Sequence, residues 1–514
     1  MKVRLLCRDR DLDLDALRPP NADALIEDLE LHVLFSAMAA GDRYLFDIAA
    51  RTVLVGLDDP EAIRYRQAVL ADCLASPITV RTMYDIAVEA IEVERKLWGA
   101  ASGRPETVLH RSAEVLHLFV ASLRRLRHIA ETSRPAFRSE GFANLFETLT
   151  VELHDAYLRV VEAQLKDLGS GVGVSMSAQL GPGNRTTSLI LRKRRREGWL
   201  ERVRVWERTG YSFEVAAQDQ AGMEALSELH GRGVALAAGA LGQSSEHILD
   251  FFRALRAELG FFLGCVNLRD GLQRRGTATC LPEPAPRGVP ILVGRQVRDP
   301  CLILSTTEPV IGSDIDAHGR TLVMMTGANR GGKSTFLRAL GLAQLMMQAG
   351  MFVAAEAFTT DVREGIFTHF RREEDRALRS GKLDEELVRM SAIVDDVTPG
   401  GLVLFNESFA STNEREGSEI ARQIVHALLE TGVRVHYVTH MFDLAQGFQA
   451  ERASDTLFLR AERLDDGRRT FRLIEGEPLP TSFGEDVYRR VFGEDPEAAA
   501  ATPMAGAGPA RRST

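Results

Sequence analysis

A glycine-rich segment from Thr326 to Thr335, with the sequence TGANRGGKST, has the G-x-x-x-x-G-K-[ST] spacing of a phosphate-binding loop. Its glycines let the backbone curl so that successive N–H groups face phosphate oxygens. Lys333 is expected to reach the β- and γ-phosphates of ATP, and Ser334 to offer its hydroxyl to Mg²⁺. The predicted nucleotide-binding residues of the loop are Gly327, Ala328, Asn329, Arg330, Gly331, Gly332, Lys333, Ser334 and Thr335.

The residues on either side of this loop have the pattern that such a loop requires. An apolar run from Leu322 to Met325 precedes it, and a helical pattern with Phe336, Leu337 and Leu340 follows it. This order predicts a buried strand, the glycine loop, and a helix whose N-terminus faces the phosphates.

A second strand, Gly401 to Phe405, is followed by Asn406 and Glu407. In phosphate-loop ATPases an acid at the first of these positions helps to fix Mg²⁺, and a carboxylate at the second activates the attacking water. Glu407 fits the second role. Asn406 is a predicted metal ligand together with Ser334, but it brings no charge to the metal, which weakens the expectation of fast hydrolysis.

A third strand, Val433 to Val438, ends at Thr439-His440. A histidine at that strand end can donate to a γ-phosphate, and the alternative is a packing role. The predicted catalytic residues are therefore Lys333, Glu407 and His440.

A helix is predicted before the second strand, with Leu383, Leu387, Met390, Val394 and Val397 on one face and Ser380 at its N-terminus. Because helix N-termini attract anions, Ser380 is a further candidate for contact with a γ-phosphate. It can act within its own subunit or complete the site of a partner.

The composition is that of an ordinary globular protein, with 45% apolar and 26% charged residues. Five scattered cysteines without C-x-x-C spacing argue for a reducing compartment and against a zinc site. No secretion signal follows Met1 and no run suits a membrane span, so we expect a cytoplasmic protein without membrane contact. A net charge of −9 means that nucleic-acid binding requires a local basic patch.

Residues from about 22 to 170 are predicted to be helical. One apolar seam comprises Leu116, Phe119, Leu123, Leu126 and Ala130, and another comprises Phe142, Leu145, Leu149, Leu153, Ala156 and Val160. From about 171 to 216 strand character replaces this pattern around the turn Gly181-Pro182-Gly183-Asn184.

A basic patch follows this turn, formed by Arg192, Lys193, Arg194, Arg195 and Arg196. Between residues 185 and 208 nine basic side chains stand against three acidic ones. The patch is suited to gripping a phosphate backbone, and the alternative is a solvated charge run.

The expected domains are a helical region over 1–280 with a small β-containing insert at about 171–216, a linker at 281–290, and an ATPase domain over 291–494. The ATPase domain alternates strand and helix, the signature of a mainly parallel sheet. Its fold class is an α/β phosphate-loop ATPase domain preceded by a mostly α-helical region. The Ala/Pro/Gly-rich segment 495–514 is expected to be a disordered tail.

Over about residues 310 to 450 the chain resembles the MutS family of DNA mismatch-repair ATPases. Thr326 to Thr335 resembles the family's TGPNMGGKST, and Thr439 to Leu444 resembles its THYFEL element. Ile366-Phe367-Thr368-His369 is similar to the family's IFTR, and Ser411-Thr412 matches the Ser-Thr pair of its GRGTST turn.

The resemblance implies a dimer with composite ATP sites, in which Ser380 is the signature serine that acts on the partner's nucleotide. It implies a lever and clamp region that encircles DNA, with the Arg192 to Arg196 patch near the DNA, and partners in a repair pathway. The chain begins almost at once with lever-type helices. We therefore expect it to lack the family's N-terminal mismatch-reading and connector domains.

Three interpretations remain at this stage. The first is a DNA-associated, homodimeric ATPase that controls a clamp state in repair or recombination. The second is a nucleotide-gated DNA-binding scaffold with little or no hydrolysis, which Asn406 favours. The third is another ABC-type ATPase, which is disfavoured because the transporter signature LSGGQ and long coiled-coil arms are missing.

Overall fold

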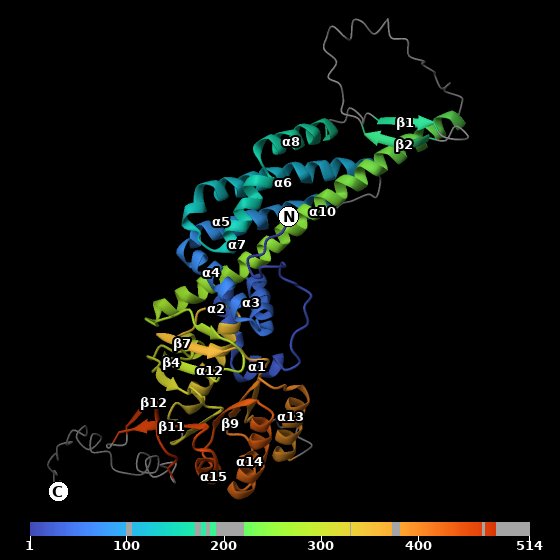
Figure 1. The fold of residues 1–514 in the computed structure, drawn as a ribbon. Helices are drawn as coiled ribbons and strands as arrows, with labels where there is room; N and C mark the ends of the chain where they lie inside the picture. The colour runs from blue at the N-terminus through green and yellow to red at the C-terminus, as the bar shows by residue number, and fades with distance from the viewer. Residues whose placement is uncertain are drawn as a thin grey trace, which may run out of the picture. The chain divides into compact units, whose positions relative to one another are not determined.

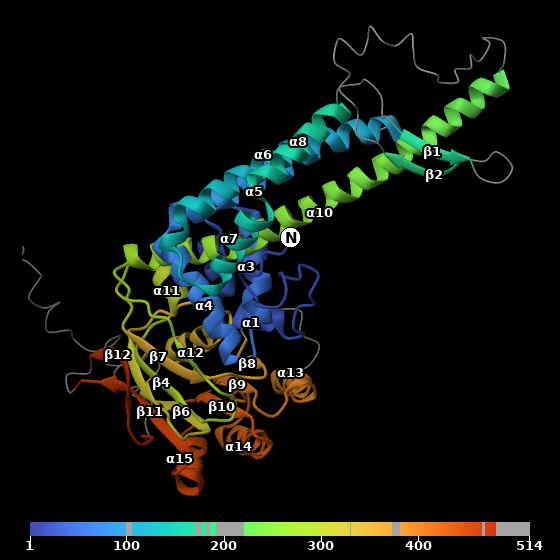
Figure 2. The ribbon, with the colours of Figure 1, turned by 45° about the horizontal axis from the view of Figure 1, so that its top comes forward.

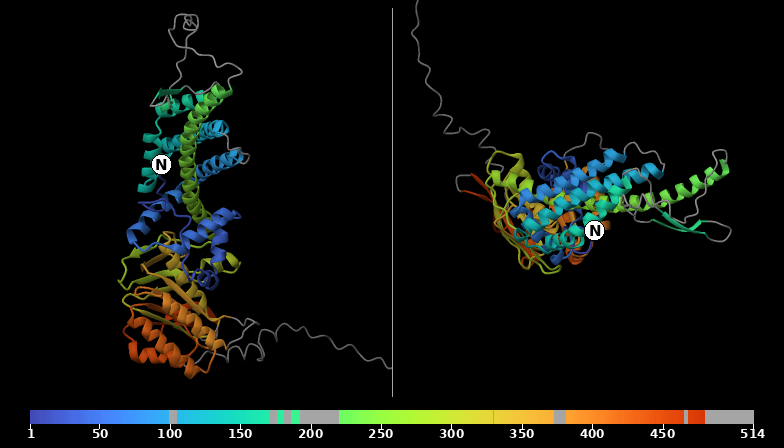
Figure 3. Two further views of the ribbon diagram at one scale, coloured as in Figure 1. Left: turned by 90° about the vertical axis from the view of Figure 1, so that its right-hand side faces the viewer. Right: turned by 90° about the horizontal axis from the view of Figure 1, so that it is seen from above.

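The computed structural model describes residues 1–98, 105–169, 176–180, 186–191, 220–328, 330–372, 381–464 and 468–479 (Figure 1). The chain forms two compact units. The helical unit comprises Met1–Asp15 and Ala68–Val266, and the sheet unit comprises Ala16–Gln67 and Asn267–Thr514. Two helices, α4 (Pro60–Ala75) and α10 (Gln220–Arg274), contribute residues to both units. Figure 3 shows α10, in green, as one continuous helix.

The helical unit is built mainly from α-helices, several of them long. Its elements are α5 (Pro77–Trp98), α6 (Pro105–Ser133), the 3₁₀ turn η1 (Arg134–Ala136), α7 (Glu140–Glu147), the π turn η2 (Thr148–Glu152) and α8 (Asp155–Gly169). The seam predicted from Leu116 to Ala130 is buried along its whole length on α6. It packs on α10, where the rings of Phe119 and Phe252 are 5.3 Å apart.

The second predicted seam holds only as far as Leu153. Phe142, Leu145, Leu149 and Leu153 are buried, but Ala156 and Val160 are exposed. The cause is the π turn and the break before α8, which change the helical phase so that Leu158 becomes the buried residue instead.

A small hairpin belongs to the same unit. Strands β1 (Met176–Leu180) and β2 (Thr186–Leu191) pair antiparallel, with Leu180 opposite Thr186, in line with the strand character predicted there. The predicted turn Gly181–Asn184 lies outside the described residues.

The N-terminal segment is fixed to α10 by one buried carboxylate. Glu258 accepts hydrogen bonds from the main-chain N–H groups of Leu5, Leu6 and Leu12 at 2.6, 3.0 and 2.8 Å. Burial raises the pKa of Glu258 to about 7, although the three N–H donors act in the opposite direction.

The sheet unit contains a six-stranded sheet in the order β12-β11-β6-β10-β9-β8. Its strands are β6 (Leu322–Thr326), β8 (Ile366–Phe370), β9 (Leu402–Asn406), β10 (Arg434–Val438), β11 (Thr456–Arg463) and β12 (Arg469–Glu475). Neighbouring strands are parallel from β8 to β11, and β12 is antiparallel at the edge. The inner strands β6, β9 and β10 are buried almost throughout because helices cover both faces, and β10 buries Arg434 and His436 as well as apolar side chains.

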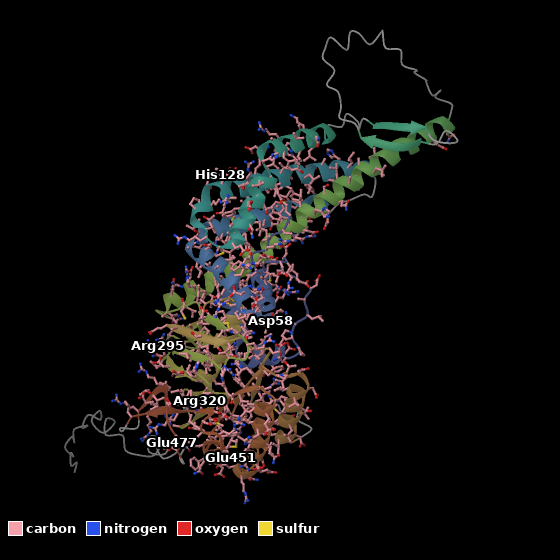
Figure 4. All side chains as sticks on the ribbon, in the orientation of Figure 1. Asp58, His128, Arg295, Arg320, Glu451 and Glu477 are labelled. Atoms are coloured by element: carbon pink, nitrogen blue, oxygen red, sulfur yellow. The ribbon has the colours of Figure 1, made fainter. Side chains whose placement is uncertain are left out.

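Helices lie on both faces of this sheet (Figure 2). One apolar cluster joins the sheet to α13 (Lys382–Asp396), α14 (Glu414–Glu430) and α15 (Phe442–Arg452). On the other face Leu404 of β9 packs against α12 (Lys333–Gln348) at Gly341, where an added Cβ would lie 2.5 Å from the leucine side chain. Glu451, labelled in Figure 4, accepts from Arg422 and His426 and so links α15 to α14.

Residues Ala16–Gln67 pack in the sheet unit, although they fall within the helical region predicted over 1–280. They form α1 (Ala22–Asp28), α2 (Leu31–Ala39), α3 (Arg43–Val55) and the start of α4. The physical reason is apolar packing on α12, since Leu29 also lies against Gly341. A hydrogen bond of 2.5 Å from Asn21 Nδ2 to the Ile366 carbonyl ties the same segment to β8.

A second, four-stranded sheet has the order β3-β7-β4-β5. Its strands are β3 (Glu283–Ala285), β4 (Leu292–Val297), β5 (Ser313–Asp316) and β7 (Ala357–Asp361), and the short helix α11 (Pro300–Ser305) follows β4. The segment 281–290, which we expected to be a linker, therefore supplies a strand. Pro284 is tolerated because β3 is an edge strand that pairs only with β7.

Candidate active site

The phosphate-binding loop has the predicted strand, loop and helix. β6 is buried along its length, and α12 begins at Lys333 with Gly332 as its N-cap. Gly327 and Gly332 adopt φ angles of +104° and +93°, a region that favours glycine. At Gly332 a Cβ would lie 2.7 Å from the Phe471 carbonyl oxygen, so the loop needs glycine there for space as well.

Lys333 is folded back over its own loop. Its Nζ donates to the carbonyl oxygens of Gly327 and Ala328 at 2.7 and 3.1 Å. Burial lowers the pKa of Lys333, Arg469 acts in the same direction, and Glu407 opposes both. The amine is thus a buried cation on the inner side of the curl, where phosphate oxygens are expected.

Three strand ends meet at the carboxyl edge of the sheet because β10 lies between β6 and β9. Ser334, which follows β6, donates from its hydroxyl to Asn406 Oδ1 at 2.8 Å. The two residues predicted as metal ligands are therefore in direct contact. Their hydroxyl and amide oxygens are hard donors of the type that suits Mg²⁺.

Glu407 and His440 lie side by side at the ends of β9 and β10. Glu407 Oε1 is 3.8 Å from His440 Nδ1, longer than a hydrogen bond, and both side chains are partly exposed. The proximity of His440 is the largest cause that lowers the pKa of Glu407, and Lys333 and Arg371 act likewise against the effect of burial. Glu407 is therefore a carboxylate at neutral pH.

The backbone after β9 has an unusual conformation. Glu407 and Phe409 have φ angles of +54° and +61°, which are costly for residues with large side chains. The loop is held by Tyr437, whose hydroxyl donates to the Ser408 carbonyl at 2.8 Å. Strain at a residue predicted to align water is consistent with a functional role.

Glu386 of α13 also holds this loop, a role that sequence reasoning missed. Its buried carboxylate accepts from Phe409 N–H at 2.5 Å and from the Ser411 hydroxyl at 2.7 Å. The sequence feature that could have revealed this role is an acidic residue among the apolar residues of α13. That face comprises Leu383, Met390, Ile393 and Val397, whereas the predicted members Leu387 and Val394 are exposed.

Two cavities adjoin the loop, and Thr335 lines both. The larger, of about 640 Å³, is polar and includes Ser334 and Asn406. The smaller has a volume of about 400 Å³ and includes Gly332 in its lining. Apolar side chains that include Val310, Ile311 and Phe471 line much of it. These residues come from separate segments, so no local pattern could identify the smaller cavity.

Several predicted site residues lie outside the described part of the chain. They are Asn329, the signature serine Ser380, and the basic patch formed by Arg192, Lys193, Arg194, Arg195 and Arg196. Arg330 is described and exposed, with a φ angle of +60°. In the described ranges no three His, Cys, Asp or Glu side chains gather as a metal site, and no helix has the length and apolar composition to span a bilayer.

Comparison with known proteins identifies the family. A family model described as the MutS2 N-terminal domain matches residues 58–275, and one described as MutS domain V matches residues 323–497. The chain belongs to the MutS family. The MutS domain V match begins within β6 and covers Lys333, Ser334, Asn406, Glu407 and His440.

Curated MutS relatives match about a third of the chain. DNA mismatch repair protein MutS from Chloroflexus aurantiacus is 33% identical over 167 residues, which are 32% of this chain and 17% of the relative. Endonuclease MutS2 from Thermus thermophilus is 31% identical over 33% of this chain and 23% of its own length. MutS protein homolog 4 from Mus musculus is 27% identical over 31% of this chain and 16% of its own length. The matches thus cover less than a quarter of each of these relatives.

Proposed function

We propose that this chain is a DNA-associated MutS-type ATPase that binds ATP with Mg²⁺ and hydrolyses it slowly. The observation that carries the proposal is the 2.8 Å hydrogen bond from Ser334 to Asn406, beside Glu407 and His440. These four residues come from the segments that follow three separate strands, and all except Asn406, which stands in place of an acid, are of the type that phosphate-loop hydrolysis requires.

Each residue has a distinct role in this proposal. Lys333 and the loop N–H groups hold the phosphates, and the apolar cavity at Gly332 accommodates the base. Ser334 and Asn406 hold Mg²⁺, which neutralises phosphate charge when it is bound. Glu407 orients the attacking water as a carboxylate, and His440 donates to the γ-phosphate.

The same proposal extends to a homodimer that acts on DNA in repair or recombination. Its support is membership of the MutS family and similarity to proteins named for DNA mismatch repair. In this arrangement Ser380 of each subunit contacts the nucleotide of its partner. ATP sets the clamp state of the helical region, and the patch from Arg192 to Arg196 contacts the DNA backbone.

Two variants test the catalytic assignment. Lys333→Ala should abolish nucleotide binding, because it removes the buried amine of the loop. Glu407→Gln should retain ATP binding and lower steady-state hydrolysis about a hundredfold or more, because an amide cannot orient and deprotonate water as a carboxylate does. ATP with the Glu407→Gln variant should also shift the protein to a dimer in size-exclusion chromatography. Hydrolysis at the parental rate by Glu407→Gln would rule out Glu407 as the water-aligning residue.

DNA binding is tested by electrophoretic mobility shift with homoduplex, mismatched and branched DNA over a salt series. Binding should weaken steeply as salt rises, and replacing Arg194, Arg195 and Arg196 by glutamine should flatten that dependence. An unchanged salt slope in the triple variant would show that the patch is only a solvated charge run.

Asn406 favours a second candidate function, a nucleotide-gated DNA-binding scaffold with little or no hydrolysis. The uncharged amide attracts Mg²⁺ less strongly than a carboxylate would, while phosphate binding by the loop is left intact. Turnover measured with Mg²⁺, with and without DNA, separates the two functions. A rate indistinguishable from that of Glu407→Gln under both conditions would favour the scaffold.

A further inference from the structure

The larger cavity beside the loop combines the metal-side residues with three arginines. Its lining includes Ser334, Thr335 and Asn406 as well as Arg338, Arg371 and Arg372, together with acidic residues of α1 and the start of α2. Because Ser334 and Asn406 mark the predicted Mg²⁺ position, the triphosphate end of a bound nucleotide faces this cavity.

Two of the three arginines form ion pairs with carboxylates. Arg338 pairs with Asp299 at 2.5 Å and also contacts Glu30, and Arg372 pairs with Glu27 at 2.9 Å. Burial raises the pKa of the remaining acid in the lining, Asp28, against the charges of Arg372 and Arg389. Within the described residues Glu30 and Glu27 therefore pair with Arg338 and Arg372 and not with Arg371.

Arg371 differs from the other two arginines. Within the described residues its side chain makes no hydrogen bond or ion pair, and it is exposed at the cavity. Its main chain is nevertheless fixed, because its N–H donates to the Asn406 carbonyl at 3.0 Å. The main chain of Arg371 is thus bonded to Asn406, the residue that contacts Ser334, and the charge of Arg371 contributes to lowering the pKa of Glu407.

We propose that Arg371 is a cis-acting arginine that contacts the terminal phosphate of ATP. This inference rests on the proposed function and deepens it. An arginine supplies charge where a phosphoryl group accumulates it, with planar donors that match phosphate oxygens. Here it compensates for the charge that Asn406 does not provide. Since only ATP carries the γ-phosphate, Arg371 makes the site distinguish ATP from ADP.

The test compares Arg371→Ala, Arg371→Lys and Arg372→Ala, with Mg²⁺ present throughout. Loss of one charge-assisted contact should weaken binding of a non-hydrolysable ATP analogue about ten- to hundredfold while ADP binding changes less than about twofold. Hydrolysis should fall by at least about tenfold in Arg371→Ala and be partly restored in Arg371→Lys. Arg372→Ala, which removes a paired arginine from the same cavity, should change the ATP-to-ADP preference by less than about twofold.

The outcomes separate this inference from the proposed function. Equal ATP-to-ADP preference and equal turnover in Arg371→Ala and the parent would overturn the role of Arg371 and leave the ATPase intact. Failure of the parent to bind either nucleotide would instead overturn the proposed function. Unchanged ADP affinity in Arg371→Ala also serves as the control for folding, because Arg371 makes no side-chain contact within the described residues.

Discussion

Among the site residues, Asn406 determines how much negative charge the protein offers to a bound Mg²⁺. Its amide oxygen accepts from Ser334 at 2.8 Å, so its geometry is that of a metal-side ligand although its charge is zero. A hard divalent cation held by neutral oxygens and phosphates is bound more weakly than one that also has a carboxylate. We therefore expect Asn406 to allow nucleotide binding without fast turnover.

The Asn406→Asp variant tests this interpretation. The added charge should lower the Mg²⁺ concentration needed for half-maximal activity and raise turnover about tenfold, measured as phosphate release over a Mg²⁺ titration. Asn144→Asp, the same change at an exposed position of α7, should leave both quantities unaltered. Equal Mg²⁺ dependence in Asn406→Asp and the parent would mean that Asn406 does not face the metal.

The sequence predicted some contacts at this scale and could not predict others. The meeting of Ser334 and Asn406 was predictable because parallel strands bring their carboxyl ends to one edge. The absence of an ion pair at Arg371 within the described residues was not predictable, because it depends on which carboxylates reach Arg338 and Arg372 from α1, α2 and the start of α11. Such pairings arise between distant segments and leave no local pattern.

Among the secondary-structure elements, α13 is joined by Glu386 to the loop that follows β9. Leu387 and Val394 are exposed, so the buried face of α13 is displaced by about one residue from the predicted apolar stripe. That rotation brings a carboxylate inward to satisfy the N–H of Phe409 and the hydroxyl of Ser411. Glu386 therefore ties α13 to the loop that follows Glu407.

Glu386→Gln should disturb this connection. The amide oxygen can still accept from the Phe409 N–H, but the Ser411 hydroxyl must then accept from the amide NH₂, so two charge-assisted hydrogen bonds become neutral ones at a cost of about 1–3 kcal/mol. We expect the free energy of unfolding of the sheet unit to fall by that amount in urea titrations, with a several-fold loss of ATP hydrolysis. Asp395→Asn, an exposed change on the same helix, should do neither. Parental stability and turnover in Glu386→Gln would show that the connection has no consequence.

Element boundaries were predictable where periodicity alone decides them and not where packing does. The seam on α6 followed directly from its spacing, whereas the phase change at Thr148–Glu152 depends on a π turn that apolar spacing does not reveal. Pro284 suggested a linker, yet an edge strand needs few N–H donors, so the same residue fits β3.

Across the molecule, the stability of the two units should change with pH in opposite directions. In the helical unit the pKa of Glu258 is about 7 against an ordinary 4.5, so the folded state binds the extra proton. Stability of that unit should decline as pH rises from 4.5 to about 7. In the sheet unit burial lowers the pKa of His369 to about 4 and that of His436 to about 3, from 6.5. The unfolded chain then binds more protons, so this unit should lose stability as pH falls below 6.5.

Hydrogen–deuterium exchange with correction for intrinsic rates measures the two trends separately. Between pH 7.5 and 5.5 each buried histidine should contribute about 1 kcal/mol of destabilisation to the sheet unit, while core peptides of α10 near Glu258 gain protection. In Glu258→Gln the gain in the helical unit should disappear. Trends of the same sign in both units would contradict the assignment of these buried groups.

The most direct test of the account is isothermal titration calorimetry of the purified chain with ATP and Mg²⁺. We expect saturable binding of one nucleotide per chain, which is lost in Lys333→Ala and retained in Glu407→Gln. Absence of binding by the parent at millimolar ATP, or undiminished binding by Lys333→Ala, would contradict the claim that this loop holds a nucleoside triphosphate.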